Sequence, residues 1–101
     1  MLRINGRDYE LRYGINTLCN MCDSGIDVMH INDLVINVKT IREMFMYGLK
    51  HDNKKITQAQ AGDLMDAYLE ENDFNKLVAE VMAALAKSLG SAVSSEGEEG
   101  K

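Results

Sequence analysis

The stretch VKTIREMFMYGLKHDNKKITQAQAGDLMDAYL, residues 38–69, predicts two helices joined by a polar turn. In its first half, apolar residues recur at the spacing of one helical face: Val38, Ile41, Phe45 and Leu49. The turn HDNKK contains no apolar residue. Thr57 then precedes a second apolar pattern, and Gln60 completes a Thr-x-x-Gln capping box. Two such helices bury their apolar faces against each other as a helical hairpin.

Capping residues set the bounds that we expect for these two helices. Asn37 is the expected N-cap of a helix over about residues 38–51, and Thr57 that of a helix over about residues 58–70. The apolar side of the second helix contains Ala61, Leu64, Met65, Tyr68 and Leu69. Asp63 and Asp66 lie on its other side, where paired carboxylates usually form a solvated face and not an acid/base pair.

The dipeptide Asn5-Gly6 predicts a β-hairpin over residues 2–13, because a type I′ turn needs positive φ at both central residues. Residues 2–4 and 9–13 alternate apolar and polar and are the expected strands. The side chains expected to point inward are Leu2, Ile4, Tyr9, Leu11 and Tyr13. Two strands alone are marginally stable in water, so the hairpin must pack on the helices or pair with a hairpin from another copy.

A short helix is expected over residues 15–24, ended by Gly25. One side of it holds Ile15, Leu18, Cys19, Met21 and Cys22. The spacing of the two cysteines also fits half a zinc site or a redox pair. Zinc prefers four ligands, however, and a redox pair would start at the helix N-terminus. Packing of both thiols in the core is therefore the favoured interpretation, with no metal or cofactor; the metal and redox roles are the alternatives.

Residues 26–37 are expected to form irregular or short extended structure. The last helix is expected over about residues 73–89, capped by Asn72 or Asp73 and closed by Gly90. Its wide apolar side contains Phe74, Leu77, Val78, Val81, Met82, Leu85 and Leu89, extended by Ala79, Ala83 and Ala86. Such a helix is either surrounded by its own domain or meets another chain with one flank, and the sequence leaves both open.

Composition bounds the class of protein. The 101 residues predict one α+β, mainly α domain over residues 1–90, with an N-terminal β-hairpin followed by about four helices in a small helical bundle. Residues 91–101 are expected to be a disordered acidic tail. The net charge of −5 disfavours a nucleic-acid partner. No apolar run has the length of roughly 18 residues of a membrane span, and two cysteines without a signal segment suggest the reducing cytoplasm.

The sequence carries no recognisable catalytic motif: neither a Gly-rich phosphate loop, nor H-E-x-x-H, nor G-x-S-x-G. We therefore expect a binding protein and not an enzyme. On the helix from Val38, Met46 and Tyr47 lie away from the apolar stripe, and adjacent exposed Met and Tyr often mark a contact site. The predicted partner-binding surface consists of Met46, Tyr47, Val78, Met82, Ala86 and Leu89.

Three stretches together resemble the small tail assembly chaperones of long-tailed bacteriophages and gene transfer agents. They are NGRDYELRYGINTLC (residues 5–19), TIREMFMYGLKHDNKKIT (residues 40–57) and QAGDLMDAYLEEN (residues 60–72). Their order along the chain also matches. One departure concerns Met46 and Tyr47, which stand where related sequences tend to carry Trp or Leu. The contact surface is therefore expected to differ in detail.

The resemblance implies a non-enzymatic chaperone that binds the tape measure protein and helps to recruit tail tube subunits during tail assembly. It implies a homo-oligomer in the cytoplasm of the bacterial host, encoded by a phage or prophage. The residues alone also allow a helical protein-interaction adaptor or an antitoxin-like regulator. A small metal or redox protein that uses Cys19 and Cys22 is the remaining alternative.

Overall fold

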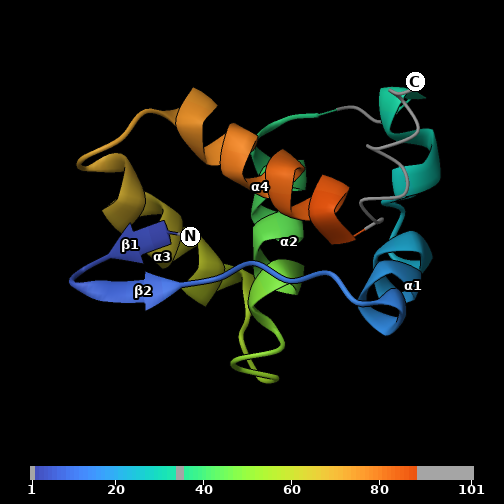
Figure 1. Ribbon diagram of the computed structural model, residues 1–101, viewed down its shortest axis with the longest axis horizontal. Helices are drawn as coiled ribbons and strands as arrows, with labels where there is room; N and C mark the ends of the chain where they lie inside the picture. The colour runs from blue at the N-terminus through green and yellow to red at the C-terminus, as the bar shows by residue number, and fades with distance from the viewer. Residues whose placement is uncertain (1, 34–35, 89–101) are drawn as a thin grey trace.

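The fold is an antiparallel β-hairpin followed by helices, as the computed structural model in Figure 1 shows for residues 2–33 and 36–88. The strands are β1 (Leu2–Ile4) and β2 (Arg7–Tyr9). The helices that follow are α1 (Ile15–Asp23), the 3₁₀ helix η1 (Val28–Asp33), α2 (Val38–Leu49), α3 (Gln58–Leu69) and α4 (Phe74–Ser88). The expected α+β, mainly α fold is thus confirmed, with four α-helices in the described part of the chain.

The central helix is α2. It packs against α1, α3 and α4, and Figure 1 shows it running through the middle of the molecule with α4 crossing in front. Its buried residues are Ile41, Met44, Phe45, Met46, Gly48 and Leu49. At 3.6 residues per turn they cover an arc of about 200° of the helix. Burial around more than half of α2 explains why this helix holds the domain together.

The sequence left open whether the fourth helix is surrounded by its own domain, and the described residues do not surround it. Leu77, Val81 and Leu85 form its buried line against the core. Ala79 and Ala83, on the flank that the sequence left open, are exposed. The wide apolar side of α4 is therefore bordered by small side chains, and the described residues leave these exposed.

Side-chain caps begin the helices where the sequence places them. Asn37 Oδ1 accepts the Thr40 N–H at 2.9 Å at the start of α2. At the start of α3, Thr57 Oγ1 accepts the Gln60 N–H at 3.1 Å, and Gln60 Oε1 accepts the Thr57 N–H at 3.0 Å. This reciprocal pair is the predicted capping box. Asp73 Oδ1 accepts the Lys76 N–H at 2.7 Å and so caps α4.

The hairpin turn is confirmed, since Asn5 and Gly6 have φ values of 53° and 78°. Leu2 pairs with Tyr9 and Ile4 with Arg7, and β1 packs on α3. The prediction of a strand over residues 9–13 was wrong in extent, because β2 ends at Tyr9. Beyond it the chain leaves β1 and crosses α2 towards α1 (Figure 1). The expected inward residues Leu2, Ile4, Leu11 and Tyr13 are buried, and Tyr9 is half-buried.

The end of α1 explains how the chain turns into η1. Gly25 has φ of 99°, and its N–H donates to Cys22 O at 3.0 Å. The Ile26 N–H donates to Met21 O at 2.8 Å, and both of these side chains are buried. This is a Schellman motif with its hydrophobic contact. It confirms Gly25 as the residue that stops the helix.

The expectation of irregular or extended structure over residues 26–37 was only partly wrong for Val28–Asp33, because η1 consists of two short 3₁₀ segments with a kink at His30, whose backbone is not helical. Asp27 provides the physical reason. Its carboxylate accepts the Met29 N–H at 3.0 Å and lies 2.8 Å from His30 Nδ1, so a side chain closes the first turn. These contacts hold the pKa of Asp27 below its usual range.

Some expectations concern parts of the chain outside the described residues. Leu89, Gly90 and the tail of residues 91–101 are among them. Within residues 2–33 and 36–88, no helix combines the length and the hydropathy that crossing a bilayer requires.

Candidate functional site

A groove of about 520 Å³ lies between the hairpin, the turn that follows α2, and α3. Figure 1 shows the hairpin beside α3, with the turn after α2 extending below them. The groove is lined by Asn5, Arg7, Tyr9, Leu49, Asp52, Asn53, Ile56, Gln60, Asp63 and Leu64. These residues come from three segments that are distant in the sequence, so the tertiary fold creates the groove.

The turn after α2 is shaped by its own hydrogen bonds. The Asp52 N–H donates to Leu49 O at 3.0 Å and continues the last turn of the helix. Asn53 Oδ1 accepts the Lys55 N–H at 3.1 Å, and the Ile56 N–H donates to Asn53 O at 3.1 Å. The chain thereby reverses, and Ile56 returns to the core with 6% exposure. Asp52 is left at the rim of the groove.

Two polar contacts connect this turn to the hairpin side of the groove. Arg7 Nη2 lies 3.0 Å from Asp52 Oδ2, and the Arg7 guanidinium lies 4.9 Å from the centre of the Tyr9 ring. His51 Nε2 donates to the backbone oxygen of Glu10 at 2.6 Å. The side chains of Arg7 and Asp52 are 64% and 49% exposed, so their ion pair adds at most about 1 kcal/mol to stability. The pair thus lies at the rim of the groove and contributes little to folding.

The groove combines an aliphatic floor with a charged rim. Leu49 and Ile56 are buried beneath it, and Leu64 is half-buried. Asp52 and Asp63 place two carboxylates at the rim. Burial of an apolar side chain against this floor is favourable, because it removes apolar surface from water. Cationic side chains next to it are attracted to the carboxylates at the rim. The arrangement suits an apolar side chain flanked by Lys or Arg.

The sequence did not predict this groove. Asp63 was assigned to a solvated face, and Arg7, Tyr9 and Asp52 carried no motif. Asp63 is indeed exposed, but it also lines the groove. Residues from three distant segments leave no periodic signal, which is why spacing along the chain could not identify them.

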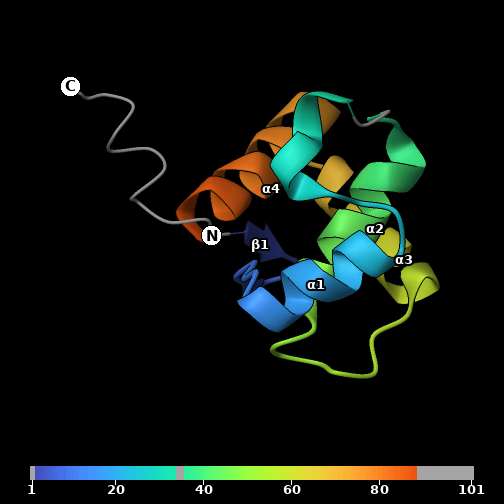
Figure 2. The ribbon, with the colours of Figure 1, turned by 90° about the vertical axis from the view of Figure 1, so that its right-hand side faces the viewer.

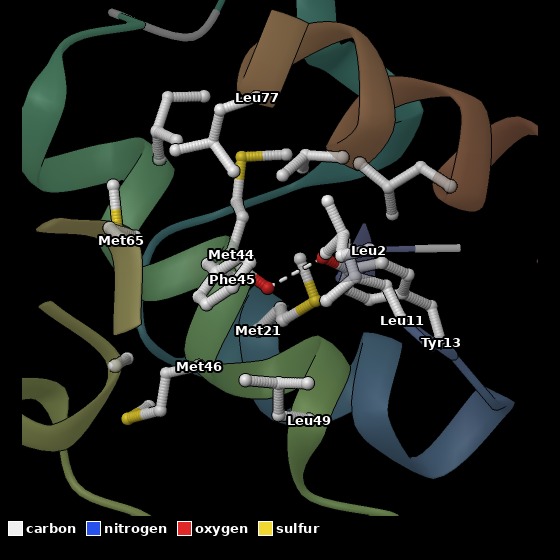
Figure 3. Packing of buried hydrophobic residues seen from close by; sticks show 14 of the residues in the cluster. Leu2, Leu11, Tyr13, Met21, Met44, Phe45, Met46, Leu49, Met65 and Leu77 are labelled. Carbon is white, nitrogen blue, oxygen red and sulfur yellow. Dashed lines mark hydrogen bonds between the residues drawn. The ribbon is translucent and has the colours of Figure 1, made fainter. Parts of the chain in front are cut away.

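The prediction that Met46 is exposed was wrong. Its side chain is 8% exposed and belongs to the core, among the side chains drawn in Figure 3. The physical reason is the central position of α2, which neighbouring elements cover over an arc wider than its main stripe, and Met46 lies at the edge of that arc. Tyr47 is half-buried and lies near Lys50, whose Nζ is 5.9 Å from the ring centre. Neither residue lines the groove beside α3.

The predicted contact residues on α4 do not line that groove either. Val78 and Met82 are half-buried and pack against the core. Ala86 is exposed, and Leu89 lies outside the described residues. None of the six residues of the predicted partner-binding surface therefore lines the groove beside α3. Whether Val78, Met82 or Ala86 contacts a partner stays a prediction.

The expectation that Cys19 and Cys22 pack in the core was wrong, because both are exposed, free thiols. At 100° per residue, the buried Leu18 and Met21 occupy one arc of α1. Ile15, Cys19 and Cys22 occupy an adjoining arc of about 60°. The domain covers only the first arc, and Ile15 is 73% exposed.

A single copy does not gather a set of metal ligands in the described part of the chain. No three His, Cys, Asp or Glu side chains lie together there as a metal site would require. The alternative of a zinc site within one chain therefore has no support from these residues. His30, which could have been a third donor, instead lies against Asp27.

Comparisons with known proteins place the chain in one family. A family model with the description "Domain of unknown function (DUF5055)" matches residues 1–99. Neither the curated proteins nor the solved structures contain a match to this chain.

Proposed function

The chain belongs to the DUF5055 family, and we propose that it is a non-enzymatic tail assembly chaperone of a phage or prophage. In this proposal it binds the tape measure protein in the bacterial cytoplasm and helps to recruit tail tube subunits. Further copies of the chain are additional partners.

One observation carries the proposal. The three stretches that resemble tail assembly chaperones, residues 5–19, 40–57 and 60–72, supply every residue that lines the groove between the hairpin and α3. The stretches are separated in the sequence but meet at one surface. A shared binding surface is a simple reason for a resemblance distributed in this way.

The chemistry of the groove suggests which part of a partner it binds. A long helical protein presents apolar side chains at intervals, with polar or charged residues between them. The aliphatic floor fits one such side chain, and the carboxylate of Asp63 fits an adjacent Lys or Arg residue, while that of Asp52 is paired with Arg7. We therefore propose that amphipathic, locally basic segments of the tape measure protein bind here.

The test is binding of the full chain to purified segments of the tape measure protein from the same locus, measured by calorimetry. Asp63→Lys should weaken binding by roughly tenfold, because it reverses a charge at the rim. Asp66→Lys is the matched control. Asp66 is exposed on the same helix three residues later, but it does not line the groove. The control should change the affinity by less than about twofold.

Two results would contradict the proposal in different ways. If no segment binds the wild-type chain, the chaperone function is wrong. If segments bind but Asp63→Lys and Asp66→Lys weaken binding equally, the function stands and the groove is not the site. In that case the half-buried Tyr47 and Met82 would be the next positions to change.

A further inference from the structure

The helix α1 carries an apolar stripe that its own domain leaves uncovered. The stripe consists of Ile15, Cys19 and Cys22, and we refer to it as the α1 stripe. All three side chains are exposed in the described chain, and neither cysteine is in a disulfide. Figure 2 shows α1 in front of the other elements, with its outer side towards the viewer. The two thiols are therefore accessible to a ligand.

The two thiols are one helical turn apart on the same face. Residues three apart on a helix have Cβ atoms about 5–6 Å from each other. Zinc binds thiolate sulfur at about 2.3 Å, so both sulfurs can reach one ion. Structural zinc sites are closed by four ligands. One copy offers only two at this place, since no group of three candidate ligands occurs in the described part of the chain.

We propose that a second copy of the chain supplies the other two ligands. In this arrangement Cys19 and Cys22 of two copies hold one Zn²⁺ between two α1 helices. The ligand count identifies the occupant: the missing half of the site is chemically identical to the half that is present. The proposal is independent of the groove beside α3 and goes beyond the proposed chaperone function.

The geometry of α1 is self-complementary. A zinc ion that two identical copies share lies on their twofold axis, so the axis passes midway between Cys19 and Cys22 of α1. When the two helices pair antiparallel about this axis, Cys19 of each copy lies beside Cys22 of the other. Four sulfurs then gather around the axis.

The charges of α1 favour the antiparallel direction. Asp23 is the only charged residue of this helix and lies at its C-terminal end, where the helix dipole disfavours a carboxylate. In the antiparallel pair, Asp23 lies opposite Leu18, in the N-terminal half of the other helix, where the dipole disfavours it less. The two Asp23 residues are then about 7–8 Å apart along the helices, whereas a parallel pair would place them side by side. The antiparallel direction therefore gives less repulsion between these two charges.

The proposed pair depends on the metal. A nine-residue helix presents far less surface than the roughly 800 Å² per partner of a stable interface. The α1 stripe alone should therefore hold two copies only weakly. When Zn²⁺ binds, four thiols lose one proton each, and the four thiolates and the ion form a site with a net charge of −2. Dimer formation should require zinc and release protons.

The test uses the full chain with a non-thiol reductant, and sedimentation velocity with and without zinc chloride. We expect a monomer without zinc and, with zinc, a species of twice the 11.3 kDa of one chain. Elemental analysis should give one zinc for every two chains. A chelator should restore the monomer. Cobalt(II) in place of zinc should show the visible absorption of a tetrahedral four-thiolate site.

Four variants separate a metal site from non-specific association. Cys19→Ser and Cys22→Ser should each abolish the zinc-dependent dimer. Asn20→Ser, exposed on the same helix outside the stripe, is the matched control and should retain it. Ile15→Glu keeps all the thiols but places a charge beside them, so it should raise the zinc concentration needed for dimerisation by about tenfold. Circular dichroism of each variant checks that the helices are intact.

Several results would overturn the proposal. One is a monomer at every zinc concentration, and another is one zinc bound per single chain. A dimer that persists in both cysteine variants would show that α1 thiols do not hold the copies together. Zinc that is removed by gel filtration alone would be an adventitious ion.

Discussion

The hydroxyl of Tyr13 lies 2.7 Å from the position that a Cβ atom on Gly48 would occupy. The same hydroxyl donates a hydrogen bond of 2.6 Å to the backbone oxygen of Met44, drawn as the dashed line in Figure 3. Next to it, the Arg12 N–H donates to Gly48 O at 2.9 Å. The segment after the hairpin therefore contacts the backbone of α2 directly, and this approach requires a residue without a side chain at position 48.

Gly48→Ala should destabilise the protein by about 1–3 kcal/mol, the usual effect of overpacking a core. The new methyl group would meet Tyr13 and the Cδ2 atom of Leu11 at 2.9 Å or less, and both side chains are held in the core. Gly62→Ala is the matched control on α3, because its methyl group would meet only the flexible Arg42 side chain, at 3.4 Å. The control should be neutral or stabilising by up to about 1 kcal/mol. Urea unfolding of both variants measures the difference; equal stabilities would contradict the contact.

Tyr13→Phe should lower the free energy of unfolding by about 1 kcal/mol at neutral pH, since it removes a buried hydrogen bond. Burial also raises the pKa of Tyr13 well above its ordinary value of 10.0. The folded state then holds the phenol proton more tightly than the unfolded state. This contribution to stability is complete below pH 10 and is lost as the pH rises above it.

The alkaline effect is measured by urea unfolding at pH 8 and pH 11. The wild type should lose more stability between these values than Tyr13→Phe does. Burial raises the pKa of Tyr68 as well, so Tyr68→Phe should act in the same direction and serves as a comparison. Identical losses in the wild type and in Tyr13→Phe would contradict a buried, neutral Tyr13.

The capping box of α3 should contribute more than either of its hydrogen bonds alone. Thr57→Ala removes the acceptor for the Gln60 N–H and should destabilise the protein by about 1 kcal/mol. Gln60→Ala removes the return bond to the Thr57 N–H. A double-mutant cycle by urea unfolding should give a favourable coupling between the two residues. Strict additivity would show that the bonds act independently.

Local signals in the sequence predicted the elements of the fold well. Asn5-Gly6 identified the hairpin turn, Thr57 and Gln60 the start of α3, and Gly25 the end of α1. Each of these depends on the conformation or hydrogen bonds of a few neighbouring residues. Such features are determined within one turn of the chain, so the sequence alone suffices to predict them.

Burial that depends on several elements was harder to predict. A helical wheel shows which side of α1 is apolar, but not how much of that side the rest of the domain covers. Cys19 and Cys22 were therefore assigned to the core although only Leu18 and Met21 reach it. Met46 presents the reverse case, because α2 is covered on more than one side. The groove beside α3 depends on contacts among three segments and has no local signal.

The exposure of the two thiols leads to a prediction about stability. Without zinc, Cys19→Ser together with Cys22→Ser should change the free energy of unfolding by less than about 0.5 kcal/mol, as exposed positions usually do. Met21→Ala on the same helix is the comparison, because Met21 is 0% exposed and its truncation should cost about 2–5 kcal/mol. Thermal or urea unfolding in the presence of a chelator measures both. A large loss in the double cysteine variant would mean that the thiols are buried after all.

The ion pair of Arg7 and Asp52 at the rim of the groove should matter for binding more than for folding. Both side chains are about half exposed or more, so Arg7→Ala should lower stability by less than about 1 kcal/mol. Removing Arg7 also frees the carboxylate of Asp52, which then joins Asp63 in attracting a basic partner. Arg7→Ala should therefore bind a basic segment of the tape measure protein faster, with the gain largest at low salt.

Arg3→Ala is the matched control, since Arg3 pairs with Asp8 at 3.0 Å on the same hairpin and does not line the groove. Stopped-flow association rates at two salt concentrations measure the effect. A slower association of Arg7→Ala would show instead that Arg7 itself contacts the partner, and equal changes in both variants would show that only the net charge of the chain acts.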